Sequence, residues 1–326
     1  MSAPVAASGL PRRLGWLPLA AVFVAASAVT ALDYSFFAGD PTLVARRSIH
    51  EGVLAHTATA PDRYRLLAPL IVEGPVRVLQ QWMPRDLAFD RVYAVFYVTA
   101  MAALLWSLFA YLRVWFTDEQ ALIAVLIVAS TLRITIRQHD YAPFSYLEPT
   151  FIALGLLLML RERWLWLGVL VAVAAFNRET GIFLVLLFAA TRPLNRSNIV
   201  MTLIYGAVWA AVFVGVRLYG GEAERYWELG RIWRTNLSQP GLTLYNVTAF
   251  LGVIWILAVV GYTRAPEFVR RAAVVIPVYA AIVAIWGLWW EVRLLLPLLP
   301  LVLPLALSAM FSPSSATLRL STQPTA

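Results

Sequence analysis

Long runs of apolar residues, separated by short charged segments, form the main pattern along this chain. A helix of about 20 apolar residues is long enough to cross the ~30 Å hydrocarbon layer of a bilayer. Ten candidate runs occur: 14–32, 92–112, 121–136, 150–160, 164–176, 181–190, 199–216, 247–262, 272–290 and 294–311. They predict an all-α fold, a polytopic transmembrane helical bundle of about ten spans, within a single membrane domain over residues 1–311.

Three of these runs, 150–160, 164–176 and 181–190, are shorter than a complete span needs. Each must take in polar flanking residues or be buried among neighbouring helices in order to cross. The polar turns that join them are then expected at the membrane edge.

Arginines in the short connections predict the orientation. One side of the bundle holds eleven of them: Arg12, Arg13, Arg113, Arg161, Arg163, Arg192, Arg196, Arg264, Arg270, Arg271 and Arg319. The other side holds four: Arg133, Arg137, Arg178 and Arg293. Because basic residues in short loops favour the cytoplasm, both termini are expected there, with residues 312–326 as a disordered tail.

Two long connections, 33–90 and 217–246, then lie outside. In the first, residues 43–54 are predicted to form a helix lying on the membrane, because its two sides differ in polarity. The polar side holds Arg46, Arg47, His50 and Glu51, and the apolar side holds Ala45, Ile49 and Val53. Residues 66–72 are apolar but too short to span, so we expect a docked segment closed by Glu73-Gly74-Pro75.

The composition agrees with a membrane protein. Hydrophobic residues make up 61% of the 326 residues and charged ones only 13%, whereas soluble domains carry about 25% charged residues. All 26 basic residues are arginines, and the net charge is +8. Since they lie between apolar runs, the expected anionic partner is a membrane surface or phosphate-bearing lipid, and not nucleic acid. The absence of cysteine excludes disulfides and cysteine metal ligands.

Ionisable groups that recur near the hydrocarbon on one face are functional candidates. Asp33 ends the first run and Asp40 follows it. A carboxylate at the mouth of a cavity suits a general base, although an acid there also simply ends a helix in water. A second set lies at the end of the third run and in the connection after it: Arg133, Arg137, His139, Asp140 and Glu148. Guanidinium, imidazole and carboxylate groups together suit phosphate binding, and equally a solvated loop with a local ion pair.

Two further sets complete the predicted outer face. Asn177, Arg178 and Glu179 lie between two short runs, where a tight turn needs polar residues anyway. Glu291 and Arg293 follow a tryptophan pair; being two apart, they would point in different directions on a helix. No histidine spacing favours a metal site, and no glycine-rich loop of a nucleotide-binding kind is present.

The layout resembles the GT-C glycosyltransferase superfamily, polytopic enzymes that take a sugar from a polyprenyl-phosphate carrier outside the membrane. The likeness consists of a first run ending at Asp33, the outer connection with its helix over 43–54, and Asp140. Asp140 lies in the second outer connection in chain order, the short one that follows the run 121–136. Three segments are also similar to those of uncharacterised bacterial members, namely 62–69 (DRYRLLAP), 177–180 (NRET) and 291–297 (EVRLLLP).

That resemblance implies an inverting transfer of a hexosyl or pentosyl group at the outer face of the bacterial inner membrane. Asp33 takes the role of base, with Asp40 as second choice, and Asp140 matches an acid of the second outer connection. Arg178 and Arg293 become phosphate contacts. The other substrate-binding candidates are Arg63, Arg65, Arg133, Arg137, His139, Glu148, Asn177, Glu179 and Glu291.

The lipid-linked sugar is the expected substrate, and no resident cofactor is implied. A divalent metal is optional, because arginine can supply the positive charge that a departing phosphate needs. The chain departs from the protein O-mannosyltransferases, in which a paired Asp-Glu often follows the first span, because Tyr34 follows Asp33 here.

Two other classes fit the same pattern. A transporter or flippase for an anionic lipid or solute would bind its ligand without chemistry, but such proteins place their sites near the midplane, often between internal repeats. We find no repeat in the sequence. The third class is a non-catalytic membrane scaffold. The sugar, the acceptor and any protein partners do not follow from the sequence.

Overall fold

The computed structural model describes residues 15–37, 40–136, 143–225 and 228–313; side chains at 33–42 and 136–143 are outside this set. Within the described residues, every regular element is a helix, and the one other feature is an isolated bridge between Ala60 and Arg225. The all-α prediction is therefore confirmed for this part of the chain.

The α-helices are, in order, α1 (Trp16–Phe37), α2 (Asp40–Leu54), α3 (Leu67–Leu79), α4 (Arg85–Leu112), α5 (Asp118–Ile136), α6 (Leu147–Leu160), α7 (Trp164–Asn177), α8 (Ile182–Thr191), α9 (Arg196–Gly220), α10 (Leu229–Ser238), α11 (Pro240–Leu251), α12 (Ile254–Gly261), α13 (Glu267–Ala273), α14 (Val275–Trp286) and α15 (Leu299–Met310). Short 3₁₀ helices join some of them: η1 (Asp62–Tyr64), η2 (Pro143–Ser145), η3 (Glu179–Gly181), η4 (Tyr262–Arg264) and η5 (Val292–Leu298).

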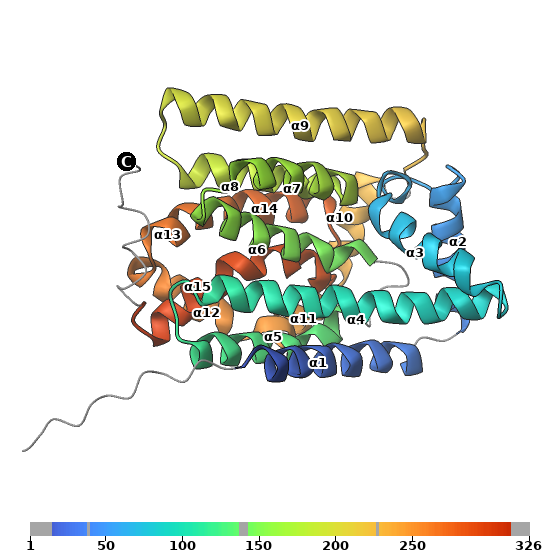
Figure 1. The fold of residues 1–326 in the computed structure, drawn as a ribbon, viewed down its shortest axis with the longest axis horizontal. Helices are drawn as coiled ribbons and strands as arrows, with labels where there is room; N and C mark the ends of the chain where they lie inside the picture. Colours follow the sequence, from blue (N-terminus) through green and yellow to red (C-terminus); the bar gives the residue numbers. More distant parts are fainter. Residues whose placement is uncertain (1–14, 38–39, 137–142, 226–227, 314–326) are drawn as a thin grey trace, which may run out of the picture.

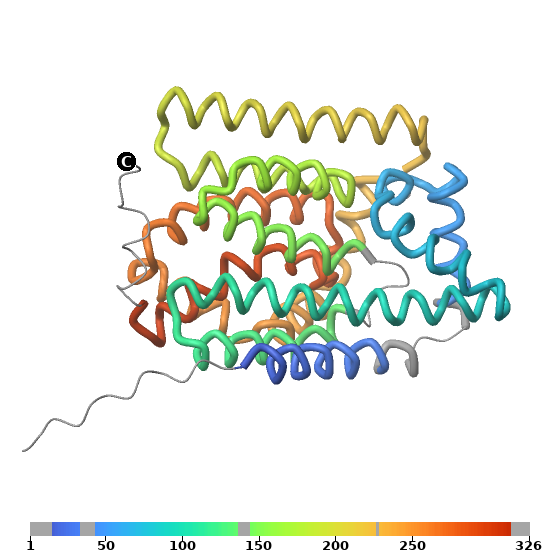
Figure 2. The backbone as a smooth tube through the Cα atoms, in the orientation of Figure 1, coloured from blue at the N-terminus to red at the C-terminus, as the bar shows by residue number. Residues whose placement is uncertain are grey.

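The long helices lie side by side along one axis, and α2 and α3 lie together at one end of the bundle (Figure 1). Helix α1 packs on α4 and α5, α4 on α6, α7 on α9, and α12 on α15. The helical segment Val292–Met310 is central, since 83% of its most apolar stretch is buried, whereas only 11% of the corresponding stretch of α9 is buried. Figure 2 shows α9 as the outermost tube on its side of the bundle.

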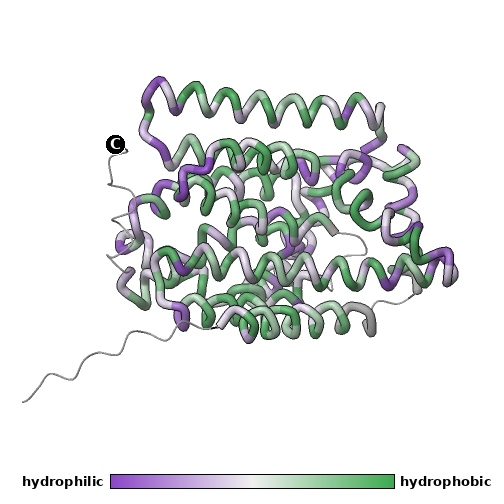
Figure 3. Tube along the Cα trace, in the orientation of Figure 1, coloured by the Kyte–Doolittle hydropathy of each residue, from purple (hydrophilic) through white to green (hydrophobic). Residues whose placement is uncertain are grey.

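Among the described residues, four helical segments are long and apolar enough to cross a membrane: α4, α9, the segment Glu267–Trp286 of α13 and α14, and the segment Val292–Met310 of η5 and α15. A fifth span is added if the pair α11 and α12, bent by 68°, counts as one. The bend falls at Gly252, whose φ of +49° suits glycine. Apolar residues follow the lengths of the helices, and hydrophilic ones gather toward the bundle ends (Figure 3). A multi-spanning membrane protein is supported, while ten crossings remain a prediction.

The first outer connection differs from its prediction. The helix over 43–54 exists as α2, but Arg46 and His50 of its polar side are buried against the protein, whereas Glu51 of the same side is exposed. Helix α3 also continues through Glu73-Gly74-Pro75 to Leu79, where the sequence predicted a stop. Contacts of the Glu73 carboxylate, described below, account for both differences. Helix α1 likewise passes Asp33 and ends at Phe37.

Close packing at the centre depends on one glycine. Gly261 of α12 lies so near α15 that a Cβ atom there would be 1.9 Å from the carbonyl oxygen of Leu305. Only a residue without a side chain permits this approach. It brings α12 against the buried leucines of α15, the most buried helix of the bundle.

Candidate functional site

Seven charged side chains gather where several helices end on one side of the bundle. We call them the ionic cluster: Asp62, Arg65, Glu148, Arg178, Glu179, Glu291 and Arg293. They come from η1 and the residue after it, from the first turn of α6, from the turn between α7 and α8, and from the start of η5. The sequence singled out six of the seven.

The strongest contact of the ionic cluster joins α7 to α6. Nη1 of Arg178, the residue after α7, donates to Oε2 of Glu148 at 2.7 Å. The two side chains are 10% and 5% exposed. Charges that are removed from water need a partner, so this ion pair fixes both helix ends.

Arg65 bridges two carboxylates. Its Nη1 donates to Oδ1 of Asp62 at 3.1 Å, and its Nη2 donates to Oε1 of Glu179 at 3.0 Å. The backbone carbonyl of Glu179 also accepts a hydrogen bond from Trp209 of α9 at 3.1 Å. The η1 segment and α9 are thereby tied to the α7–α8 turn.

Arg293 completes the ionic cluster from the C-terminal helices. Its Nη2 donates to Oε2 of Glu291 at 3.0 Å, and its Nη1 donates to Oγ of Ser145 at 3.4 Å. The prediction that Glu291 and Arg293 point apart is wrong, because Glu291 precedes η5 and is not on a helix. Arg293 also interacts electrostatically with Arg178 and Arg65. The three arginines therefore lie within electrostatic range of one another.

A buried aromatic ring lies beneath two of these arginines. The guanidinium carbons of Arg65 and Arg178 are 4.4 Å and 5.6 Å from the centre of the Phe144 ring. Nδ2 of Asn177 donates to the carbonyl of Phe144 at 3.2 Å. Cation–π contact of this kind stabilises desolvated guanidiniums. Phe144 had no role in the sequence prediction.

Several buried polar atoms here have no hydrogen-bond partner among the described residues. They are the Nε atoms of Arg65, Arg178 and Arg293, Oε1 of Glu148 and Oδ1 of Asn177. Buried polar groups normally form hydrogen bonds, and each buried donor or acceptor without one costs about 1–3 kcal/mol of stability. A concentration of five such atoms in one region suits a polar ligand. The arginines offer such a ligand only part of their donors, because carboxylates already hold the others.

Two of the remaining predicted residues, Arg63 and Arg133, lie elsewhere. Arg63 is not in the ionic cluster: its Nε donates to the carbonyl of Ala58 at 2.7 Å and its Nη1 to that of Glu222, which fastens the first outer connection to the end of α9. Arg133 is exposed in the last turn of α5. The side chains of Asp33, Asp40, Arg137, His139 and Asp140 are outside the described residues.

A second buried polar group explains the fold of α2 and α3. Nε2 of His50 contacts Oε2 of Glu73 at 3.2 Å, and Nδ1 of His50 contacts the hydroxyl of Tyr93 at 2.9 Å. Burial raises the pKa of Glu73, but hydrogen bonds from Arg77, His50 and Arg85 outweigh burial and hold that pKa at about 2. The ionised carboxylate can only accept, so His50 Nε2 donates to it and Tyr93 donates to Nδ1.

Acid is expected to weaken this second group. Burial lowers the pKa of His50 below 6.5, against the opposing effects of Glu73 and Glu51 and together with the repulsion of Arg85. The stability that neutral His50 contributes is complete above pH 6.5 and is lost as the pH falls through the lower pKa of the folded state. Glu73 adds a further loss only below about pH 4.5.

The thermal unfolding midpoint measured from about pH 8 to about pH 5 checks this expectation. His50→Gln, which keeps a donor and an acceptor, should show a smaller fall than the parent protein. His56→Gln serves as the matched histidine control and should behave as the parent does. An equal pH dependence in His50→Gln and the parent contradicts the assignment.

The described residues form an all-α bundle with four or five candidate membrane-spanning segments and a buried ionic cluster at one end. No protein family, curated protein or solved structure matches the chain. Among the described residues, no group of three or more histidine and acidic side chains is arranged to hold a metal ion. The assignment to the class of helical membrane proteins therefore rests on the structure alone.

Proposed function

We propose that this protein is an integral membrane glycosyltransferase, which transfers a sugar from a polyprenyl-phosphate carrier to an acceptor on the outer face of the cytoplasmic membrane. The observation that carries the proposal is the gathering of Arg65, Arg178 and Arg293 within electrostatic range of one another at the end of an apolar bundle. Guanidinium stays charged and binds phosphate through two parallel donors.

The chemistry needs two things from the protein. The acceptor hydroxyl must lose its proton to a base as its oxygen attacks the anomeric carbon, and the bond from that carbon to the phosphate oxygen must break. Arginine hydrogen bonds stabilise the charge that develops on the departing phosphate. Asp33 and Asp40 are the proposed bases, in that order; α1, which carries Asp33, runs toward the end of the bundle where α2 and α3 lie (Figure 1).

The proposed topology has ten crossings, with both termini in the cytoplasm and the ionic cluster outside. Support comes from the helices found at all ten apolar runs and from the arginine distribution. Because the chain has no cysteine, single cysteines at Ser35 and Ser197 can be labelled selectively. An impermeant thiol reagent should label them from opposite faces of the membrane; labelling from the same face contradicts the topology.

The activity is tested by incubating reconstituted protein with polyprenyl-phosphate sugars and measuring acceptor glycosylation. Asp33→Asn or Asp40→Asn should abolish transfer, and Arg293→Lys should lower the rate by roughly 10²–10³-fold, as for removal of a preorganised donor. Arg271→Gln, at an exposed ion pair with Glu267 on α13, is the control and should keep the parental rate. Full activity in both aspartate variants removes the proposed bases.

A transporter remains the alternative. The break between α11 and α12 favours it, because transporters often bind substrates where a spanning helix is interrupted. However, the sequence around that break, 247–261, contains no ionisable residue, so the break offers an anion only backbone groups. Counterflow of a labelled lipid without covalent product would favour transport, and the absence of both activities would favour a scaffold.

A further inference from the structure

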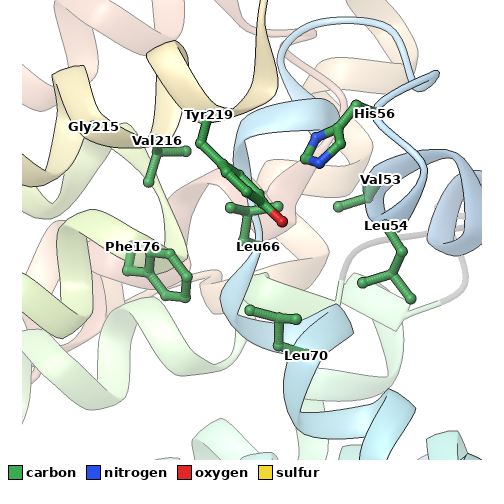
Figure 4. Close-up of a pocket in the computed structure, with 9 residues that line it drawn as sticks. All are labelled: Val53, Leu54, His56, Leu66, Leu70, Phe176, Gly215, Val216 and Tyr219. Carbon is green, nitrogen blue, oxygen red and sulfur yellow. The ribbon is translucent and has the colours of Figure 1, made fainter.

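A pocket lies between α3 and α9, beside the residues that follow α2. Its volume is about 300 Å³, at the lower end of the range for ligand pockets. It is lined by Val53, Leu54, His56, Leu66, Leu70, Phe176, Gly215, Val216 and Tyr219 (Figure 4). We call it the α3–α9 pocket.

The walls of the α3–α9 pocket are almost entirely apolar. Val53, Leu66 and Val216 are buried and form a small hydrophobic cluster of their own, separate from the main core. Leu70 and Phe176 add to the apolar lining (Figure 4). An apolar cavity of this kind favours hydrocarbon over water.

Two side chains with polar groups, His56 and Tyr219, interrupt this lining. The His56 ring meets the Tyr219 ring edge-on, with 4.5 Å between centroids. Nδ1 of His56 is buried and has no hydrogen-bond partner among the described residues. The turn that carries His56 is fixed, because the amides of Thr57 and Ala58 both donate to the carbonyl of Gly52. His56 is therefore held in place at the wall of the apolar cavity, with its Nδ1 atom covered by the protein.

The helices on both sides of the α3–α9 pocket face outward. Leu70 of α3 is 49% exposed and Leu218 of α9 is 79% exposed, both with apolar side chains. Helix α9 is also the candidate span with the least burial inside the protein. In a bilayer such surfaces contact lipid, so an apolar chain can reach the pocket sideways without crossing water.

We propose that the α3–α9 pocket binds the apolar chain of a membrane lipid, either acyl or prenyl. The volume accommodates only a segment of such a chain, so the remainder lies along α3 and α9. This inference does not rest on the proposed sugar transfer, and its test measures binding alone.

Gly215 provides the variant for the test. A Cβ atom built at Gly215 meets no atom within 4 Å, so Gly215→Phe introduces a large side chain at the pocket wall without a clash at its first carbon. Replacing a glycine within a helix also favours the helical state. Gly206 is the matched control, because it lies on the same helix, has equally open surroundings and does not line the pocket.

The measurement is photo-crosslinking in nanodiscs, with two probes used separately. One is a phosphatidylglycerol with a diazirine at the end of an acyl chain, and the other is a polyprenyl phosphate with the same group on its chain. Crosslinks to α3 and α9 are located by peptide mass spectrometry. When each probe competes with the unlabelled form of the other lipid, the probe that keeps more of its crosslinking shows whether the occupant is an acyl or a prenyl chain. Either result supports the proposal.

Gly215→Phe should lower pocket crosslinking by about tenfold, which corresponds to ~1.4 kcal/mol of lost binding, whereas Gly206→Phe should leave it unchanged. Leu70→Trp fills the pocket from the opposite wall and should have the same effect. Thermal unfolding confirms that each variant is folded. Labelling of the pocket residues by neither probe, or parental labelling in both filled variants, overturns the inference.

Discussion

Glu148→Ala is expected to lower the free energy of unfolding by about 3–5 kcal/mol, the range for breaking a buried ion pair. The substitution removes the carboxylate that accepts from Arg178 at 2.7 Å. Because Arg178 is itself buried, its guanidinium cannot reach water and remains charged without a partner. The ends of α6 and α7 would then lose their main polar connection.

A denaturation series in nanodiscs measures this loss. The control is Glu267→Ala, which breaks the exposed ion pair of Glu267 with Arg271 and should cost no more than about 1 kcal/mol. Glu148→Leu combined with Arg178→Met should recover much of the stability, because no charge is then buried. Equal losses in Glu148→Ala and Glu267→Ala contradict the structural importance of the pair.

Gly261→Ala is expected to destabilise the protein by about 3 kcal/mol, the upper part of the usual range for overpacking. The added methyl group would lie 1.9 Å from the carbonyl oxygen of Leu305 and 2.8 Å from the amide nitrogen of Ala309. Both are backbone atoms of a helix, so no rotamer change can relieve the contact. Helices α12 and α15 must separate, which opens the most buried part of the bundle.

The same unfolding measurement checks this expectation, with Gly206→Ala as the control. Gly206 has open space around it, and replacing a helical glycine by alanine stabilises a helix by roughly 0.5–1 kcal/mol. The two variants should therefore change stability in opposite directions. A neutral Gly261→Ala would mean that α12 and α15 are not packed as closely as described.

The sequence predicted the helices well, because a run of apolar residues specifies a buried or lipid-facing helix almost regardless of its partners. It also placed Arg178 and Arg293 on the same face. The reason is geometric: helices of similar length in antiparallel succession end at the same two levels, so polar turns in alternate connections meet. The ionic cluster was predictable to this extent from residue order alone.

The partners of those residues were not predictable. Phe144, which lies under two guanidiniums, is one apolar residue among many in the sequence. The buried side of α2 was predicted to face water, because histidine and arginine usually do. His50 is satisfied instead by Glu73 and Tyr93, which are 23 and 43 residues away along the chain. Periodicity defines the faces of a helix but not what covers them.

Helix α9 has a consequence for how the protein responds to its bilayer. Its 25 residues correspond to a length of ~38 Å at 1.5 Å per residue, which exceeds the ~30 Å hydrocarbon thickness. Such a helix accommodates the mismatch by tilting, and little of its surface is held inside the protein. A thicker bilayer would reduce the tilt and shift Gly215 and Tyr219 relative to α3. We therefore expect the width of the α3–α9 pocket to change with membrane thickness.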